Sequence, residues 1–412
     1  MLVIVLVSAG LIPFSSFGQS GSQTASEVDS RTTTVLERAR PELDPLGMKI
    51  SGFIMSPSLQ VGVSFNDNIF ATQTNTRDDV IATVTPGIQI SSDWNQHSLA
   101  FAASGDVVRY ATNDAEDHET YNLSVDGRLD VRRDTKLSAK AGYKLGSEER
   151  GSVDDVNGST PTEFDIRSIE AGIINKSNRL SLSAVGGFSL RDFDDAGAIN
   201  NDDRDRDELS FTFRGGYEIQ DQYEAFAQVI LTSVNYDALV DDNGLNRDNE
   251  GYEIRAGARI DITGLLFGDV FVGYLNRNYD GATLRPVDTV VGGLDITWNV
   301  TSLTTIKAGF ERVVDETTLA TASGNLTTGY NLSVDHELLR SLILSARVGI
   351  STDEFEGASR EDDYVKAGLG AKYLLNRNLS FLLRYDYSER DSNVAGADNE
   401  TNMILLTLQA RI

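Results

Sequence analysis

The chain of 412 residues contains no cysteine, three histidines and seven prolines. The lack of cysteine excludes a disulfide framework, a cysteine-ligated zinc site and a thiol nucleophile. No internal apolar run is long enough to be a membrane-spanning helix, which excludes a helical membrane protein. Basic residues are also scarce. The 36 Lys and Arg stand against 62 Asp and Glu, and the net charge of −26 argues against a nucleic-acid partner.

The apolar run at residues 2–14 has the length of an export signal and is too short to span a membrane. Ser16 and Gly18 supply the small residues of a cleavage site, so we expect residues 1–18 to be a signal peptide. No Lys or Arg precedes Arg31, so either the start codon lies upstream or the signal is atypical. A buried N-terminal strand is the alternative.

From about Ser58 onward, apolar and polar residues alternate with a period of two. Residues 121–132 show this clearly, because Tyr121, Leu123 and Val125 alternate with Asn122, Ser124 and Asp126. Successive side chains of a strand point to opposite faces, so each segment has one apolar and one polar face. The segments run for roughly 10 to 15 residues, which is the length that a tilted strand needs to cross a bilayer.

The connections between these segments are of two kinds. Very short polar turns recur about every 40 residues, one hairpin plus one loop apart. They are expected at residues 94–96, 133–134, 176–178, 221–222, 263–264, 299–301, 339–340 and 376–378. Long stretches rich in Asp, Asn and Gly lie between them, at residues 113–118, 151–162, 192–207, 237–248, 353–363 and 391–399.

Short turns at one end and long polar loops at the other are typical of outer-membrane barrels. We therefore expect an all-β, transmembrane, antiparallel up-and-down β-barrel of about 18 strands over residues 53–412. It would have short periplasmic turns and long acidic extracellular loops, in the outer membrane of a Gram-negative bacterium. Residues 19–52 would be a leader that hangs in the periplasm, folds into the lumen as a plug or contacts a periplasmic partner.

Five short segments also carry a family resemblance. The chain reads Arg-Pro-Glu-Leu-Asp-Pro-Leu-Gly at 40–47, Ser-Pro-Ser-Leu at 56–59 and Asn-Asp-Asn-Ile-Phe-Ala at 66–71. Together with Ser-Asp-Trp at 92–94 and His-Ser-Leu at 97–99, these resemble the outer-membrane β-barrel porin type 2 family, over residues 40–412. The resemblance implies a step in exopolysaccharide secretion across the outer membrane, and it carries over no catalytic residues.

Charged side chains recur on the polar face of the strands, which would line the lumen. The candidate pore-lining residues are Asp126, Arg128, Arg132, Lys140, Lys144, Arg214, Arg255, Arg259, Lys307, Arg347, Lys366, Lys372 and Arg384. As a set they would form a charge ladder that hydrates and steers a polar or anionic solute. The alternative is that these charges pair across neighbouring strands and brace the wall.

Two other groups of residues resemble functional sites, a metal site and a catalytic site. The acidic runs at 201–208 and 353–356 lack the register of a calcium loop, so we expect solvated loop ends and no metal. His118 lies beside Asp114, Glu116 and Asp117, the one place where a His/Asp pair could activate water. No phosphate-binding loop, dinucleotide motif or nucleophile elbow occurs, so we expect neither catalysis nor a cofactor.

These features predict a channel for a secreted exopolysaccharide, with a diffusion porin for small polar or anionic solutes as the alternative. A third possibility is a structural or adhesive barrel whose lumen is sealed. The expected partners are outer-membrane lipid and lipopolysaccharide, the polysaccharide or solute, and a periplasmic polysaccharide-export protein.

Overall fold

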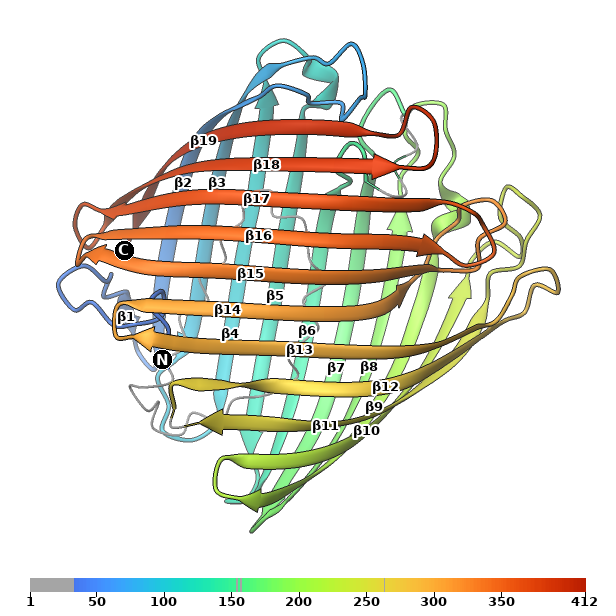
Figure 1. Cartoon of the computed structure of the whole chain (residues 1–412). Coiled ribbons are helices and arrows are strands. Elements are labelled where there is room, and N and C mark those ends of the chain that lie inside the picture. The colour runs from blue at the N-terminus through green and yellow to red at the C-terminus, as the bar shows by residue number, and fades with distance from the viewer. Residues whose placement is uncertain (1–32, 153–154, 156–157, 263) are drawn as a thin grey trace.

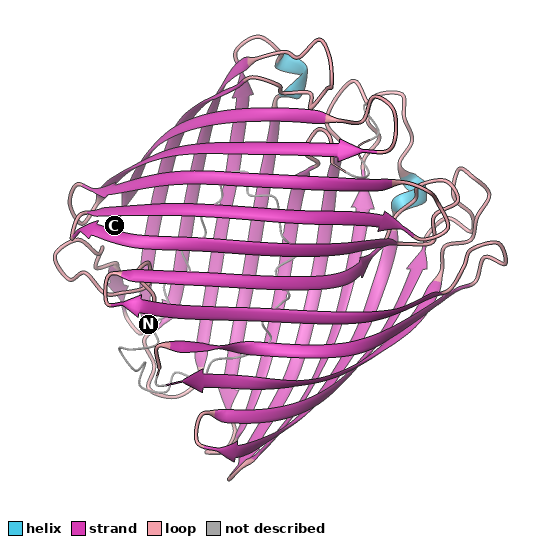
Figure 2. Cartoon of the chain, in the orientation of Figure 1, coloured by secondary structure: helices cyan, strands magenta, loops and turns pink. Residues whose placement is uncertain are grey.

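The computed structural model describes residues 33–152, 155, 158–262 and 264–412. The expected signal peptide, residues 1–18, lies outside the described residues. Strands account for nearly all the regular structure, and the two helices described are single 3₁₀ turns, η1 (Asp114–Glu116) and η2 (Asp202–Arg204) (Figure 2). No helix in the described part of the chain is long and apolar enough to cross a membrane.

The first strands are β1 (Met48–Ile50), β2 (Phe53–Asn66), β3 (Asp79–Ser92), β4 (Ser98–Tyr110), β5 (His118–Asp130), β6 (Thr135–Ser147), β7 (Glu163–Ser177), β8 (Leu180–Phe193), β9 (Arg206–Gln220) and β10 (Tyr223–Tyr236). The others are β11 (Asn249–Ile262), β12 (Leu266–Tyr279), β13 (Val287–Thr301), β14 (Thr304–Asp315), β15 (Asn325–Leu339), β16 (Leu342–Phe355), β17 (Glu361–Leu374), β18 (Leu379–Ser392) and β19 (Asn399–Arg411).

Strands β2 to β19 pair antiparallel in chain order, and β19 pairs back onto β2. This confirms the expected closed antiparallel barrel of 18 strands (Figure 1). Closure leaves no unpaired sheet edge, which is what a strand protein inside a membrane requires. The short strand β1 pairs with the first residues of β2, beyond the point where β19 ends.

The outer face of the wall is apolar and exposed. Val272 and Leu369 each expose about 60 % of their surface although they lie in the middle of strands, and Val290, nearer the start of β13, exposes as much. A soluble protein rarely leaves so large an apolar surface uncovered, whereas lipid covers it in a transmembrane barrel. The aromatic residues Tyr217 and Trp298 also face outward, near strand ends.

Two expected connections differ from those observed. The turn expected at 299–301 lies instead at 302–303, because a bulge between Asn299 and Thr301 lengthens β13. The loop expected at 353–363 shrinks to 356–360, because β16 and β17 run on through its acidic ends. Asp362 faces inward there and is compensated by Arg360 and Arg390, both 2.8 Å away.

The sequence pattern does not predict two of the long connections, 280–286 and 316–324, because they are poor in Asp and Asn. The one at 316–324 is structurally important because it folds inward. β14 pairs with β13 only as far as Arg312, and its last residues separate from β13 while they stay paired with β15. Val314 then packs against the inward-facing Leu275, Val287 and Val291.

Candidate functional site

Charged and polar side chains line the inner face of the barrel, as the alternation predicts for a lumen. Cross-strand register places twelve of the thirteen candidate residues on this face. The exception is Arg132, which lies exposed in the turn between β5 and β6. The expectation that Arg132 lines the pore is wrong, because the turn closes between Arg132 and Thr135 and takes the residue out of the wall.

The lumen arginines and lysines differ in their surroundings. Each candidate arginine in a strand has a carboxylate partner: Arg128 with Asp130, Arg214 with Glu224, Arg255 with Glu253, Arg259 with Asp269, and both Arg347 and Arg384 with Asp386. Among the described residues, no carboxylate lies within 4.0 Å of the ammonium groups of Lys140, Lys144, Lys307, Lys366 or Lys372. The arginines therefore brace the wall, and the lysines present charge to the lumen.

A cavity of about 580 Å³ opens into the lumen at the long-loop end, between β6–β10 and the inward-bent end of β14. Five basic and five acidic residues line it. They are Lys140, Arg191, Arg204, Arg206 and Arg277, with Glu148, Glu170, Glu208, Asp315 and Glu316. The cavity has the size of a small-molecule site, and its lining is balanced in charge rather than basic.

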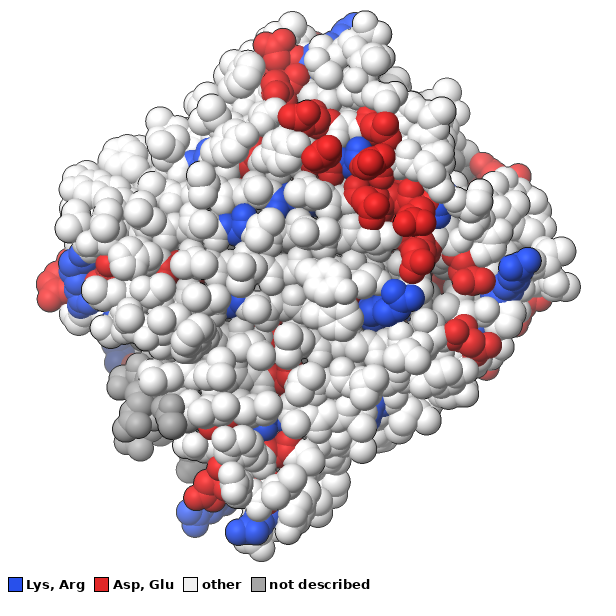
Figure 3. All heavy atoms as spheres, in the orientation of Figure 1, with Lys and Arg blue, Asp and Glu red and all other residues white. Residues whose placement is uncertain are grey.

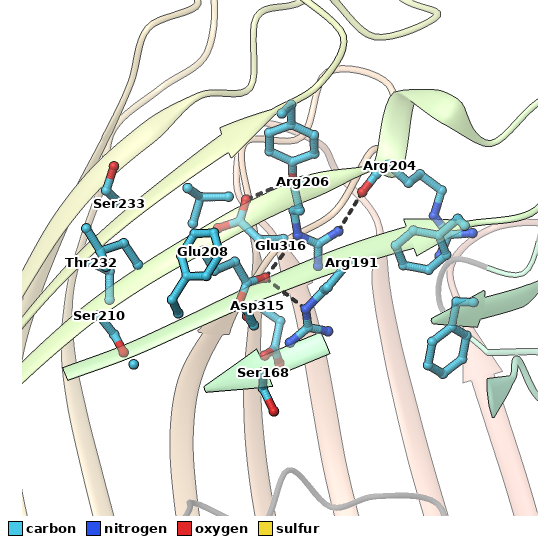
Figure 4. A pocket seen from close by; sticks show the side chains of 18 of the residues that line it. Ser168, Arg191, Arg204, Arg206, Glu208, Ser210, Thr232, Ser233, Asp315 and Glu316 are labelled. Atoms are coloured by element: carbon cyan, nitrogen blue, oxygen red, sulfur yellow. Dashed lines mark hydrogen bonds and ion pairs between the residues drawn. The ribbon is translucent and has the colours of Figure 1, made fainter. Parts of the chain in front are cut away.

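One wall of the cavity is built around Glu208 on β9. Arg191 on β8 and Arg206 on β9 are directly opposite each other, and the Nε atom of each lies 3.0 Å from the same oxygen of Glu208 (Figure 4). Arg204, in η2, forms a two-point ion pair with Glu148 and stacks 4.1 Å from the ring centroid of Phe193. These contacts hold the guanidinium groups in place.

The facing wall is built around Glu316, just after β14. Arg277 on β12 lies 2.5 Å from Glu316, and the Tyr236 hydroxyl donates to the same carboxylate at 3.1 Å. Asn249 donates to it as well. The preceding residue, Asp315, is exposed to the lumen. Among the described residues, the one hydrogen bond to its carboxyl group comes from the Thr327 hydroxyl, at 3.4 Å.

The candidate residues did not include Arg191, Arg204, Arg206 and Arg277. Arg191 and Arg277 continue the inward-facing alternation of their strands, so the period of two was enough to find them. Arg206 begins β9 and has the same inward-facing position in the alternation as Arg214, so the period of two also marks it. Arg204 lies at the end of an acidic loop, and no sequence pattern marks its inward position.

Arg247 holds the inward-folded connection 316–324 in place. It is 2 % exposed and donates to the carbonyl oxygens of Thr317, Leu319 and Ala322 at 2.5–3.0 Å. It also pairs with Asp241 at 2.7 Å. Burial by itself would raise the pKa of Asp241, but the backbone N–H of Leu245 and the Arg247 guanidinium lower it below the ordinary value.

Residues 33–40 of the leader occupy part of the lumen at the short-turn end. Val35 is fully buried, and its N–H donates to the Thr305 hydroxyl at 2.9 Å. Arg40 is 3 % exposed and donates to Glu337 and to the Val35 carbonyl, both at 2.8 Å. Thr305 and Glu337 face inward on β14 and β15, so the arrangement corresponds to the plug-like alternative for residues 33–40.

The remaining candidate sites show ordinary local contacts. His118 begins β5, and its Nδ1 lies 2.8 Å from the carbonyl oxygen of Glu116. Glu116 itself pairs with Arg150 at 2.7 Å. Over the described ranges, no group of three His, Cys, Asp or Glu side chains is arranged to hold a metal ion.

The carboxyl group of Asp205, in the loop before β9, has a perturbed acidity. Burial raises its pKa to about 6, although the backbone N–H of Phe193 donates to it at 2.7 Å and acts in the opposite direction. The nearby carboxylates of Asp192, Asp202 and Asp237 add to the rise.

Comparison with solved structures gives other barrels. The chain is 14 % identical to Pseudomonas aeruginosa OpdL, covering 88 % of this chain and 100 % of that one at a TM-score of 0.45. For P. aeruginosa OccK2 (OpdF) the identity is 10 %, the coverages are 88 % and 98 %, and the TM-score is 0.48. Identities this low say nothing of what passes through the lumen. No curated protein matched the chain.

A family model matches residues 40–412, which include every strand of the barrel. Its description is "Putative beta-barrel porin 2". The match covers the segments at 40–47, 56–59 and 66–71 on which the resemblance was based. The chain therefore belongs to this family and is an outer-membrane, porin-like β-barrel channel.

Proposed function

We propose that this barrel is a passive diffusion channel for small polar and charged solutes. The observation that carries the proposal is the 580 Å³ cavity, whose charged lining opens into a polar lumen. Lysine ammonium groups along the wall attract solute, and the paired arginines keep the wall rigid. Many weak contacts suit transport, because a tightly bound solute would not leave.

Both ends of the lumen favour small solutes over a polysaccharide chain. At the extracellular end, the connection 316–324 folds inward and is held by Arg247. At the periplasmic end, Val35 and Arg40 are buried against β14 and β15. A polymer would have to displace both segments. Exopolysaccharide export, and the periplasmic export protein that it requires, are therefore the second candidate.

We also propose lipopolysaccharide as the lipid partner of the extracellular rim. Acidic side chains gather on the outer surface over the loop ends of β16–β19 (Figure 3). Glu389 and Glu400 stand directly opposite each other there, as do Asp363 and Asp391. Like charges at such positions repel, so cations bound by lipopolysaccharide would stabilise this rim.

A deletion strain separates the two candidate functions. Small-solute uptake and secreted polysaccharide are measured in the deletion strain and after restoring the wild-type gene. Our proposal predicts slower uptake of small polar solutes with unchanged polysaccharide. Loss of secreted polymer with unchanged uptake would contradict it and support the exporter.

A further inference from the structure

The cavity in the lumen carries one uncompensated positive charge on its β8–β9 wall. Arg191 and Arg206 share a single carboxylate, that of Glu208, so the three groups have a formal charge of +1. Directly opposite like charges destabilise a sheet, and one carboxylate neutralises only one of them. The Arg191 side chain is 35 % exposed, so its guanidinium is accessible to a solute.

The facing wall carries one uncompensated negative charge. Glu316 is engaged by Arg277, but Asp315 has no cationic group within 4.0 Å among the described residues. The side chain of Asp315 is exposed to the cavity that it lines. Asparagine at this position would keep the shape and remove the charge.

The other charges of the lining balance in number. Arg204 forms an ion pair with Glu148 and Arg277 with Glu316, whereas Lys140 and Glu170 are opposite in register but form no ion pair within 4.0 Å. The cavity is therefore dipolar, with an excess cation on β8–β9 and an excess anion at the end of β14. Hydroxyl groups of Ser168, Ser189 and Ser210 line the space next to the arginine wall.

We infer that this cavity selects small zwitterions, solutes that carry one carboxylate and one ammonium group, such as amino acids. The inference rests on the proposed channel function. A zwitterion compensates both walls at once, with its carboxylate at Arg191 and its ammonium group at Asp315. A monoanion compensates only the arginine wall and is repelled by Asp315. A monocation compensates only Asp315 and is repelled by the arginine wall.

Four solutes of matched size test the inference: β-alanine, propionate, propylammonium and neutral propionamide. Their flux into proteoliposomes containing the purified full-length protein is measured at constant ionic strength and low solute concentration. We expect β-alanine to enter about fivefold faster than either single-charge solute, the effect of a screened charge pair.

Two substitutions move the selectivity in opposite directions. R191Q removes the excess cation but leaves Glu208 paired with Arg206, so we expect propylammonium to become as fast as β-alanine. D315N removes the excess anion, so in this variant we expect the flux of propionate to become as fast as that of β-alanine. Asp315→Ser serves as a second variant if D315N does not assemble, as judged by heat-modifiable migration on gels.

Matched controls lie in the lumen outside the cavity. Arg259→Gln removes an ion-paired arginine on β11, and Asp126→Asn removes a carboxylate on β5. Both should retain the preference for β-alanine. Equal flux of all four solutes through the wild type, or unchanged preference in both cavity variants, would overturn the zwitterion site and leave a non-selective channel. No flux of any solute would overturn the channel function itself.

Discussion

Arg40 and Glu337 form a buried ion pair, with 2.8 Å between Nη2 and Oε2, although they are 297 residues apart in the chain. Arg40 comes from the leader and Glu337 from the inner face of β15. Removing one partner of a buried pair leaves the other charge uncompensated, which costs about 3–5 kcal/mol. Arg38 and Arg340 lie farther from Glu337, at 3.9 and 3.7 Å, so we expect the Arg40 pair to be the main contact that holds residues 33–40 in the lumen.

We expect Glu337→Gln to release the leader and raise the single-channel conductance. Because the chain has no cysteine, a cysteine placed at the fully buried Val35 reports undocking directly. V35C should react with a maleimide in the E337Q background and resist it in the parent. The double reversal R40E/E337R should restore protection in part. Equal labelling in both backgrounds would show that the pair does not hold the leader.

Arg247 is the corresponding contact at the other end of the lumen. Arg247→Ala removes three hydrogen bonds to the connection 316–324 and leaves Asp241 without its partner. We expect a loss of about 3 kcal/mol in the free energy of unfolding and increased current noise as the connection moves. Arg247→Lys keeps the charge but cannot reach three carbonyl groups, so it should restore the stability only in part. Quiet single-channel currents in R247A would contradict this role.

Because Gly368 has no side chain, the ion pair between Arg347 and Asp386 can cross over β17. Arg347, Gly368 and Asp386 are in register on β16, β17 and β18, and the Arg347–Asp386 pair spans the middle strand at 2.7 Å. A Cβ atom on Gly368 would lie 2.6 Å from Nε of Arg347 and 2.9 Å from Oδ1 of Asp386.

We expect Gly368→Val to separate this pair and turn the Arg347 guanidinium toward the lumen. The stability should fall by no more than about 1 kcal/mol, because both groups are partly exposed. The preference of the open channel for anions over cations, measured as a reversal potential in a salt gradient, should rise. Gly370→Val, at an inward-facing glycine on the same strand, is the control.

The raised pKa of Asp205 predicts a pH-dependent stability. Its value of about 6 in the folded protein exceeds the usual value near 4, so ionisation weakens the fold. This contribution is fully favourable below about pH 4 and is lost as the pH rises through 6.

Asp205→Asn should therefore raise the melting temperature at pH 7.5 and leave it unchanged near pH 4. The gain is at most about 1 kcal/mol, because the group is partly solvent-exposed. The exposed Asp202 in the same loop, changed to Asn, is the control. A gain of the same size at both pH values would contradict the titration of Asp205.

The alternation of apolar and polar residues predicted the closed barrel, its 18 strands and the inner face of each strand. It succeeded because every strand contacts lipid on one side and water on the other, so the pattern is enforced along the whole wall. The short polar turns that end the strands are also visible in the local sequence.

The alternation of apolar and polar residues could not predict contacts across the lumen. Arg277 meets Glu316 only because the end of β14 separates from β13, and Arg40 meets Glu337 only because closure brings β15 to residues 33–40. Neither the inward folding of 316–324 nor the docking of 33–40 changes the local alternation. The paired state of the arginines likewise depends on register between strands, which single-strand periodicity does not contain.

The most direct test of the channel function is the conductance of the purified full-length protein in planar lipid bilayers. We expect stepwise ohmic currents, and adding β-alanine should produce brief partial blocks as solutes occupy the cavity lined by Arg191 and Asp315. A membrane-inserted, heat-modifiable barrel that carries no current at any voltage would contradict the channel function and indicate a sealed lumen.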